Sequence, residues 1–426
     1  MSAVERSVPP ASAAAVANYP WLLIGMLWLA AFLNSAGRQI LITVLPQVRA
    51  EFGLSATQLA LINSVGFWTY AVGALIFGRL GDATHRSRLI AGGLAFWAVA
   101  TGLVSISTGL ITLIVIRGLV ATGEATYYPT AAALISDWHR SGTRSRALSI
   151  HQTGVFAGAG VGAVTAGALA DAFGWRSPFL IFGLIALIFC AVLFKWLRDA
   201  PVAPASNVAA AGASSRGPLR TVLRRPAALM LCVVFFLANG AVCGIIVWAP
   251  TFLHDELGLD LAGAALYGSA TLSAAGVLCV PLGGFLAHRL AARTPLAVFY
   301  VLAIGLALAG LLLLPLRFAT SAFAVGAVLF ASGAGKGLFD GCIYAAMHDV
   351  VPPAARATAV GLMTLVGFCG AGLAPIGVAQ VGGWIGMAPA MTSLAFLYLA
   401  AAILLVATRS STLRTLLDTR EIEDRR

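Results

Sequence analysis

The most constraining feature of this sequence is a succession of apolar segments, each long enough to cross a lipid bilayer as a helix. A helix needs about 20 mainly apolar residues to span a hydrocarbon core about 30 Å thick. Hydrophobic residues make up 60% of the chain and charged residues 10%, which excludes an ordinary soluble domain. We therefore predict an all-α polytopic membrane protein with twelve transmembrane helices, at approximately 21–45, 55–78, 89–107, 109–137, 147–170, 177–197, 226–252, 261–287, 295–316, 320–350, 357–381 and 387–408.

Basic residues are concentrated in alternate connections between these segments. The pairs Arg86 and Arg88, and Arg144 and Arg146, stand in two such connections, and the connections between them are poor in Lys and Arg. Cytoplasmic loops of membrane proteins carry an excess of Lys and Arg, so this pattern places both termini in the cytoplasm. It predicts a multi-pass protein of the cell inner (plasma) membrane and accounts for the net charge of +11 without a nucleic-acid partner.

One long connection, at 199–225, is rich in Ala, Ser and Pro and then becomes basic. This composition is typical of a flexible linker. The predicted organisation has a cytoplasmic N-terminal tail at 1–19, a six-helix bundle at 20–198, the cytoplasmic linker at 199–225, a second six-helix bundle at 226–408 and a cytoplasmic C-terminal tail at 409–426.

The two halves repeat each other in sequence. Gly123-Glu124 and the run Phe156–Gly160 recur at an offset of 212 as Gly335-Lys336 and Phe368–Gly372. Near the first helix of each half, Glu51–Ser55 corresponds to Glu256–Asp260 at an offset of about 205. Two repeats of six spans that start on the same side are parallel repeats, related by an axis along the membrane normal. The small-residue runs permit close helix packing.

The fourth segment carries two charged residues, Arg117 and Glu124, at membrane depth. Seven residues make about two helical turns, so both side chains project from one face, about 10 Å apart along the axis. A charge at that depth costs at least about 2.5 kcal/mol, and such residues normally face a water-filled cavity or a partner. The pair therefore marks either a lined pathway or a structural ion pair that locks two helices.

Three further charged residues lie within apolar segments: Arg38, Lys336 and Asp340. An arginine fork suits a carboxylate, so Arg38 is a candidate for binding an anionic substrate, or alternatively a partner for Glu124. Lys336 and Asp340 are spaced i, i+4 and either contact the substrate or neutralise each other. The five central charges leave a surplus of one positive charge, which an anion would balance. Neutral hydrogen-bonding candidates for the same site are Tyr70, Tyr128, Gln152 and Asn239.

The connection after the second segment reads Gly78-Arg-Leu-Gly-Asp82-Ala-Thr-His-Arg86-Ser-Arg88 and resembles the loop 2–3 signature of the major facilitator superfamily. The resemblance implies the fold of that family, with two parallel six-helix repeats. It also implies that Gly78, Asp82, Arg86 and Arg88, with Asp137 at the end of the fourth segment, form a cytoplasmic gate.

A narrower resemblance rests on Asn34–Gln39, on Arg117 through Glu124 to Pro129, and on Gly174–Phe179, and it points to the anion:cation symporter family. It implies transport of a small organic anion such as a sugar acid or aromatic acid. The Arg–Glu helix is shared with Spinster-like lipid transporters. The symporter family commonly has an Asp–Arg pair in the first span, whereas this chain has Gly37 before Arg38, so Glu124 is the better-supported proton-coupling acid, beside Arg117.

Other function classes find less support in the sequence. No metal-ligand cluster, catalytic triad or nucleotide-binding loop is recognisable, so we expect neither an enzyme nor a bound metal or cofactor. The expected partners are a small organic anion, protons and the lipid bilayer, and the expected state is a monomer. The alternatives are a Spinster-like exporter of lysolipids or drugs, and a sensor that binds solute without transporting it.

Overall fold

The computed structural model describes residues 10–139, 141–200, 216–352, 355–410 and 412–413. The first half contains α1 (Pro10–Phe52), α2 (Ala56–Ala83), α3 (Arg86–Leu103), α4 (Leu110–Ala125), α5 (Tyr127–Trp138), α6 (Ser141–Phe173) and α7 (Arg176–Trp196). After α8 (Arg216–Leu223), the second half contains α9 (Pro226–Asp255), α10 (Leu261–Ala265), α11 (Thr271–Ala291), α12 (Ala297–Leu313), α13 (Ala322–Asp340), α14 (Ile343–Val350), α15 (Arg356–Ile385) and α16 (Met387–Ala407).

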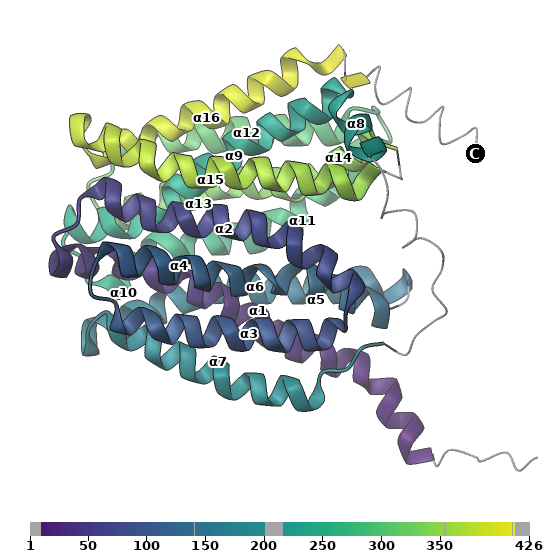
Figure 1. The fold of residues 1–426 in the computed structure, drawn as a ribbon. Coiled ribbons are helices and arrows are strands. Elements are labelled where there is room, and N and C mark those ends of the chain that lie inside the picture. Colours follow the sequence, from purple (N-terminus) through teal and green to yellow (C-terminus); the bar gives the residue numbers. More distant parts are fainter. Residues whose placement is uncertain (1–9, 140, 201–215, 353–354, 411, 414–426) are drawn as a thin grey trace, which may run out of the picture.

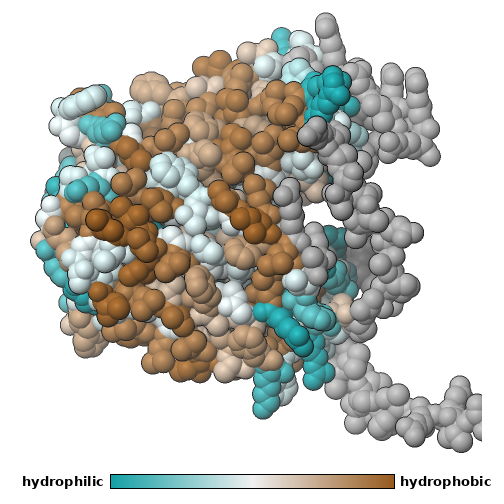
Figure 2. All heavy atoms as spheres, viewed as in Figure 1, coloured by the Kyte–Doolittle hydropathy of each residue, from teal (hydrophilic) through white to brown (hydrophobic). Residues whose placement is uncertain are grey.

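The predicted twelve transmembrane helices are confirmed. In the described part of the chain, 12 helices are long and apolar enough to cross a membrane, and α4 with α5, α10 with α11, and α13 with α14 each form one span. Within a helix every backbone N–H and C=O is satisfied internally, which is what a hydrocarbon environment requires. Apolar side chains accordingly cover the middle of the surface in Figure 2, and hydrophilic side chains gather toward its two ends.

Figure 1 shows the helices of the two halves as two stacked groups that run roughly along one direction. The beginning of α1, the end of α16 and the helix α8 all lie at one end, which we call the terminal end. The helix α10 lies near the opposite end, which we call the distal end. Because each half has an even number of spans, the chain enters and leaves each half at the same end.

Matching local structures confirm the sequence repeat. Gly53 and Gly258 both have a positive φ, +62° and +69°, in the turns that follow α1 and α9. This left-handed conformation favours glycine. Ser55 and Asp260 then cap the next helices, because their side chains accept hydrogen bonds from the backbone N–H groups of Gln58 and Gly263.

The small-residue runs also have the same packing role in both halves. A Cβ atom at Gly158 would be 2.2 Å from the carbonyl oxygen of Phe32, and one at Gly370 would be 2.3 Å from that of Phe236. Both glycines therefore allow a long helix to lie directly against the first helix of its own half, α6 on α1 and α15 on α9.

The structure departs from the prediction in three places. Helix α1 begins at Pro10 rather than near residue 20, since the Ala-rich segment before the span has a high helix propensity. The basic end of the predicted linker forms α8, whereas residues 201–215 lie outside the described part. The fourth and tenth spans are each interrupted, at Thr126 and at residues 341–342. The predictions for residues 1–9 and 414–426 also lie outside the described part.

The two halves contact each other along α2 and α15 and at the distal end. The hydroxyl of Ser64 donates a hydrogen bond of 2.5 Å to the carbonyl oxygen of Gly372. At the distal end, Arg49 pairs with Asp255 at 3.2 Å, and both carboxylate oxygens of Asp171 accept backbone N–H groups at the start of α10, at 3.1 and 3.0 Å. These contacts close the distal end between the halves.

A cavity of about 660 Å³ lies toward the terminal end and is open to solvent. Its lining comes from α5 and α6 and includes Tyr128, Arg144 and Gln152. This volume falls within the range of small-molecule sites. This cavity therefore lies between α5 and α6 of the first half, toward the terminal end.

Candidate functional site

Arg117 and Glu124 face each other on α4, as their spacing predicts. The Nη1 atom of Arg117 lies 3.2 Å from Oε1 of Glu124, and the two residues are only 4% and 1% exposed. The other carboxylate oxygen, Oε2, lies 3.4 Å from Nε of Arg38 on α1. Glu124 is thus held between two guanidinium groups. Charges this deeply buried persist only when they are paired.

Arg38 is the accessible member of this cluster. Its side chain is 29% exposed, against 2% for Glu124, and its guanidinium lies 5.0 Å from the centre of the Tyr70 ring. One terminal nitrogen makes a long contact of 3.5 Å with Oδ1 of Asn34. Arg38 contacts Glu124 through Nε, so Glu124 does not occupy the two terminal nitrogens, the pair with which a guanidinium binds a carboxylate in a fork.

Glycines create the room for these guanidinium groups. A Cβ atom at Gly66 on α2 would be 2.6 Å from Nε of Arg117. A Cβ atom at Gly123 would be 2.7 Å from Cβ of Trp97 on α3, so this glycine lets α3 lie against α4. Just beyond Glu124 the helix is interrupted, and the hydroxyl of Thr126 donates to the carbonyl oxygen of Gly123. These small residues leave the space that the charged cluster occupies between the helices.

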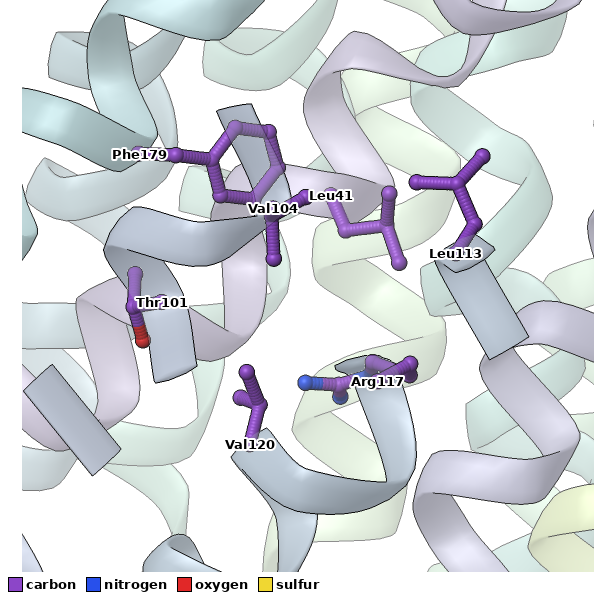
Figure 3. Close-up of a pocket in the computed structure, with 8 residues that line it drawn as sticks. Leu41, Thr101, Val104, Leu113, Arg117, Val120 and Phe179 are labelled. Carbon is purple, nitrogen blue, oxygen red and sulfur yellow. The ribbon is translucent and has the colours of Figure 1, made fainter. Parts of the chain in front are cut away.

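A small cavity of about 10 Å³ lies beside Arg117. Figure 3 shows the Arg117 guanidinium and the Thr101 hydroxyl projecting toward this space, with Leu41, Leu113 and Phe179 on its other sides. A cavity of this size accommodates about one water molecule. A cavity of this size is too small for an organic substrate.

The second half contributes a different kind of pair. Nζ of Lys336 lies 2.5 Å from Oδ1 of Asp340, which confirms that these two residues contact each other across one helical turn of α13. The lysine side chain is only 6% exposed, and the aspartate side chain is 39% exposed. The lysine ammonium also lies 5.1 Å from the Phe339 ring. Asp340 is therefore the accessible member of this pair, and Lys336 is buried.

The neutral candidates have separate positions. The hydroxyl of Tyr128 donates to Oε1 of Gln152 at 2.9 Å, and both residues line the open cavity. The amide nitrogen of Asn239 donates to the carbonyl oxygen of Gly367 at 3.1 Å, which joins α9 to α15. Tyr70 packs on Arg38 and on Phe368 of the other half, at 5.0 and 4.9 Å. The structure therefore groups Tyr70 with the charged cluster and leaves Asn239 in a helix–helix contact.

Two residues that the sequence did not single out belong to the same central region. Tyr344 on α14 is 45% exposed and lies near Tyr70, Tyr128 and Asp340. The Cys243 thiol on α9 lies near Lys336, Arg38 and Asp340. Their sequence surroundings are apolar and carry no signal for a site, and only the packing of the two halves brings them to the centre.

The predicted gate is assembled in part. Arg86 at the start of α3 forms an ion pair with Asp137 near the end of α5, as predicted. Arg88 is exposed, and Gly78 lies on α2 with open space around its Cα. Asp82 lies on α2, and its side chain is outside the described part.

The sequence analysis missed another partner of the same loop. Asp199 accepts hydrogen bonds from the backbone N–H and the hydroxyl of Ser87, at 2.8 and 2.9 Å, and lies 3.2 Å from the His85 ring. The first residue of the predicted linker thus fixes the start of α3. The contact joins positions more than a hundred residues apart, which sequence spacing cannot reveal.

Several known proteins with similar sequences are named as transporters. Over 247 residues the chain is 26% identical to the hexuronate transporter of Bacillus subtilis, covering 56% of this chain and 58% of that protein. It is 26% identical over 327 residues to the probable sulfoacetate transporter of Cupriavidus necator, covering 73% and 75%. It is 30% identical over 304 residues to human protein spinster homolog 1, covering 67% and 58%. The chain thus spans less than two thirds of two of these three relatives.

The fold and a family model agree with these relatives. A bacterial homolog of the human lysosomal transporter Spinster, solved in an inward-facing and unoccupied conformation, superposes with a TM-score of 0.77 at 22% sequence identity. The match covers 95% of this chain and 98% of that chain. The family model described as Major Facilitator Superfamily matches residues 27–375. With its twelve spans, its repeated halves and this match, the chain belongs to the Major Facilitator Superfamily.

Proposed function

We propose that this protein is a secondary transporter that moves a small organic anion across the cell inner membrane by alternating access, coupled to protons. The observation that carries the proposal is the position of Glu124, held between Arg38 and Arg117 at 3.4 and 3.2 Å. Two guanidinium groups against one carboxylate leave a positive charge in the first half. Arg38 is the group that exposes this charge to the central space.

Arg38 binds the substrate carboxylate in this proposal. Its planar fork matches a carboxylate in a bidentate arrangement, and the neighbouring Tyr70 ring limits the directions in which the fork can point. Tyr128 and Gln152 offer hydrogen bonds from the cavity wall. A sugar acid or an aromatic acid suits this combination of one cationic fork and several hydroxyl or amide groups, and the names of two relatives refer to hexuronate and sulfoacetate.

Glu124 carries the coupled proton. When Glu124 is ionised, it competes with the substrate for Arg38. Protonation removes that competition and raises the local positive charge, so a proton and an anion bind together more favourably than either binds alone. Binding of one ligand that strengthens binding of another is coupling in the thermodynamic sense. Arg117 contacts Glu124 from the buried side and holds the carboxylate in position.

Alternating access follows from the two-half arrangement. With both termini in the cytoplasm, the cavity opens to the cytoplasm and the contacts of Arg49 and Asp171 close the outer face. Transport then requires these distal contacts to separate while the terminal side closes. The Arg86–Asp137 pair and the Asp199 contacts hold the loop between α2 and α3 at that terminal side.

A Spinster-like exporter is the second candidate, favoured by the 30% identity to human spinster homolog 1. A lysolipid needs a largely apolar cavity for its chain, whereas Arg38 and Asp340 present charged groups to the central space. A sensor that binds without transport is the third.

Uptake by purified protein in proteoliposomes tests these candidates. A pH gradient, acidic outside, is imposed, and accumulation of radiolabelled glucuronate, gluconate, sulfoacetate and phthalate is measured with and without a protonophore. Proton-dependent accumulation of an organic acid is the expected result. Movement of a fluorescent lysolipid without uptake of any acid contradicts the proposal and favours the exporter. Binding of an acid without any flux favours the sensor.

A further inference from the structure

The two halves present opposite charges to the central space. In the first half the exposed group is the Arg38 guanidinium, and Glu124 is buried behind it with 2% exposure. In the second half the order is reversed, because Lys336 is buried with 6% exposure and Asp340 is 39% exposed. A ligand between the halves therefore meets a cation on one side and a carboxylate on the other.

Asp340 and Arg38 share neighbouring residues, although they belong to different halves. The Cys243 thiol on α9 lies near Lys336, Asp340 and Arg38. Tyr344 lies near Asp340 and near Tyr70, whose ring is 5.0 Å from the Arg38 guanidinium. Asp340 and Arg38 therefore belong to one central group of side chains to which both halves contribute.

The pair with Lys336 occupies only part of the Asp340 carboxylate. Nζ of Lys336 contacts Oδ1, and for Oδ2 the described residues supply no ion pair or hydrogen bond. A carboxylate that served only to neutralise a buried lysine would be expected to be buried with it, because burial strengthens the attraction between the two charges. The exposure of Asp340 leaves Oδ2 available as a hydrogen-bond acceptor for a ligand.

We infer that Asp340 determines substrate specificity by accepting a hydrogen bond from a hydroxyl or ammonium group at the far end of the carboxylate that Arg38 binds. This inference rests on the proposed function and narrows it to a substrate class: monocarboxylates with hydrogen-bond donors at the opposite end. A second carboxylate at that end would be repelled by Asp340, and an apolar end would leave Oδ2 of Asp340 without a hydrogen bond.

Binding of matched ligands to the purified full-length protein, measured by calorimetry, tests the inference. One series keeps the carboxylate and changes only the far end: hexanoate, 6-hydroxyhexanoate, 6-aminohexanoate and adipate. Four-carbon and eight-carbon series of the same kind cover other spans between the two groups. We expect the hydroxy and amino acids to bind about tenfold more tightly than the plain acid, and the dicarboxylate to bind most weakly, as one charge-assisted hydrogen bond allows.

The variant Asp340→Asn removes the charge and keeps the shape. It should remove the preference for the amino acid and improve binding of the dicarboxylate by about tenfold. Because Asp340→Asn alone leaves a buried lysine without its partner, the double variant Lys336→Met/Asp340→Asn is made beside it. Both the single and the double variant should lose the preference for the amino acid over the plain acid. Glu256→Gln, which changes an exposed acid in a loop, is the control and should keep the wild-type ranking.

Two outcomes overturn the inference, and they are distinguishable. If carboxylates bind in a way that Arg38→Lys weakens, yet the ranking is unchanged in the double variant, Asp340 is only the counter-ion of Lys336 and the proposed function stands. If no member of any series binds the wild-type protein, or Arg38→Lys binds all of them as tightly as wild type, the proposed function fails and the inference fails with it.

Discussion

The indole ring of Trp97 occupies the space in which a side chain at Gly37 would lie. A Cβ atom at position 37 would be 2.1 Å from Cζ2 of Trp97, far closer than packed atoms approach. Trp97 is fully buried on α3, so it cannot move aside without opening a cavity. The packing of Trp97 therefore leaves no room for an acidic side chain at position 37, next to Arg38.

Gly37→Ala should destabilise the protein by about 1–3 kcal/mol, the usual cost of overpacking a filled core. Thermal unfolding of the purified protein in detergent measures the loss. Combining Gly37→Ala with Trp97→Leu should restore part of the stability, because the smaller side chain leaves room for the added methyl group. Gly25→Ala is the matched control on the same helix, since no atom lies within 4 Å of a Cβ there, and it should change stability little. Equal effects of the two alanines would contradict the packing argument.

Glu124→Gln should abolish proton-driven accumulation of the substrate and spare counterflow. Glutamine keeps the size and hydrogen-bonding ability of the side chain but cannot release a proton at any working pH. The two assays are run in the same proteoliposomes, so a folded and active variant is recognised by its counterflow. Glu256→Gln is the control and should behave as wild type. If Glu124→Gln still concentrates substrate with a pH gradient as the sole driving force, another acid carries the proton, and Asp340 is the next candidate.

Arg38→Lys should weaken substrate binding by about tenfold or more. Lysine keeps the charge but loses the planar fork, and the loss of one charge-assisted hydrogen bond corresponds to roughly that factor. Kd values from calorimetry with the transported acid measure the effect. Arg293→Lys, at an exposed position after α11, provides a matched exchange that should leave Kd unchanged. Unchanged affinity in Arg38→Lys would exclude bidentate binding at this residue.

Asp171→Ala should shift the protein toward a state that is open at the distal end. The carboxylate accepts two backbone N–H groups from the other half, and hydrogen bonds to charged groups contribute about 1.5–3 kcal/mol each. The exposed Arg49–Asp255 pair contributes less, about 0–1 kcal/mol, so Arg49→Ala should shift the population less. Electron spin resonance distances between labels at Phe173 and Glu256 report the separation of the halves.

Glu51→Gln is the control for the distal end. Glu51 lies at the same end, but its partners Trp175 and Arg176 belong to its own half, at 2.6 Å each. Glu51→Gln should leave the distance between the two spin labels unchanged, even if it lowers thermal stability. A shift as large as that of Asp171→Ala would mean that general loosening, rather than loss of a contact between halves, moves the population.

Much of this architecture is readable from the sequence because it depends on composition and local spacing. The twelve spans follow from apolar length, and the contact of Arg117 with Glu124 follows from helical period. The turns at Gly53 and Gly258 follow from a repeated motif.

The features that the sequence could not supply depend on packing between distant segments. Trp97 fills the space at Gly37 from another helix, and Asp199 reaches Ser87 across 112 positions. The spacing of Lys336 and Asp340 predicts their contact, but which of the two is exposed depends on the helices around them. For the same reason Tyr344 and Cys243 gave no signal before the halves were assembled.

On the proposed mechanism, the uneven number of charges at the centre also determines how the carrier responds to membrane voltage. Arg38, Arg117 and Lys336 outnumber Glu124 and Asp340 by one, so the empty site holds one elementary positive charge. In alternating access the site takes the electrical potential of whichever face its cavity opens to, and one charge moved through 100 mV changes the energy by about 2.3 kcal/mol. A monovalent anion that enters with one proton leaves that charge unaltered. Both half-cycles then move the same charge in opposite directions, so voltage shifts the orientation of the empty and the loaded carrier alike and leaves the final concentration ratio of the substrate unchanged.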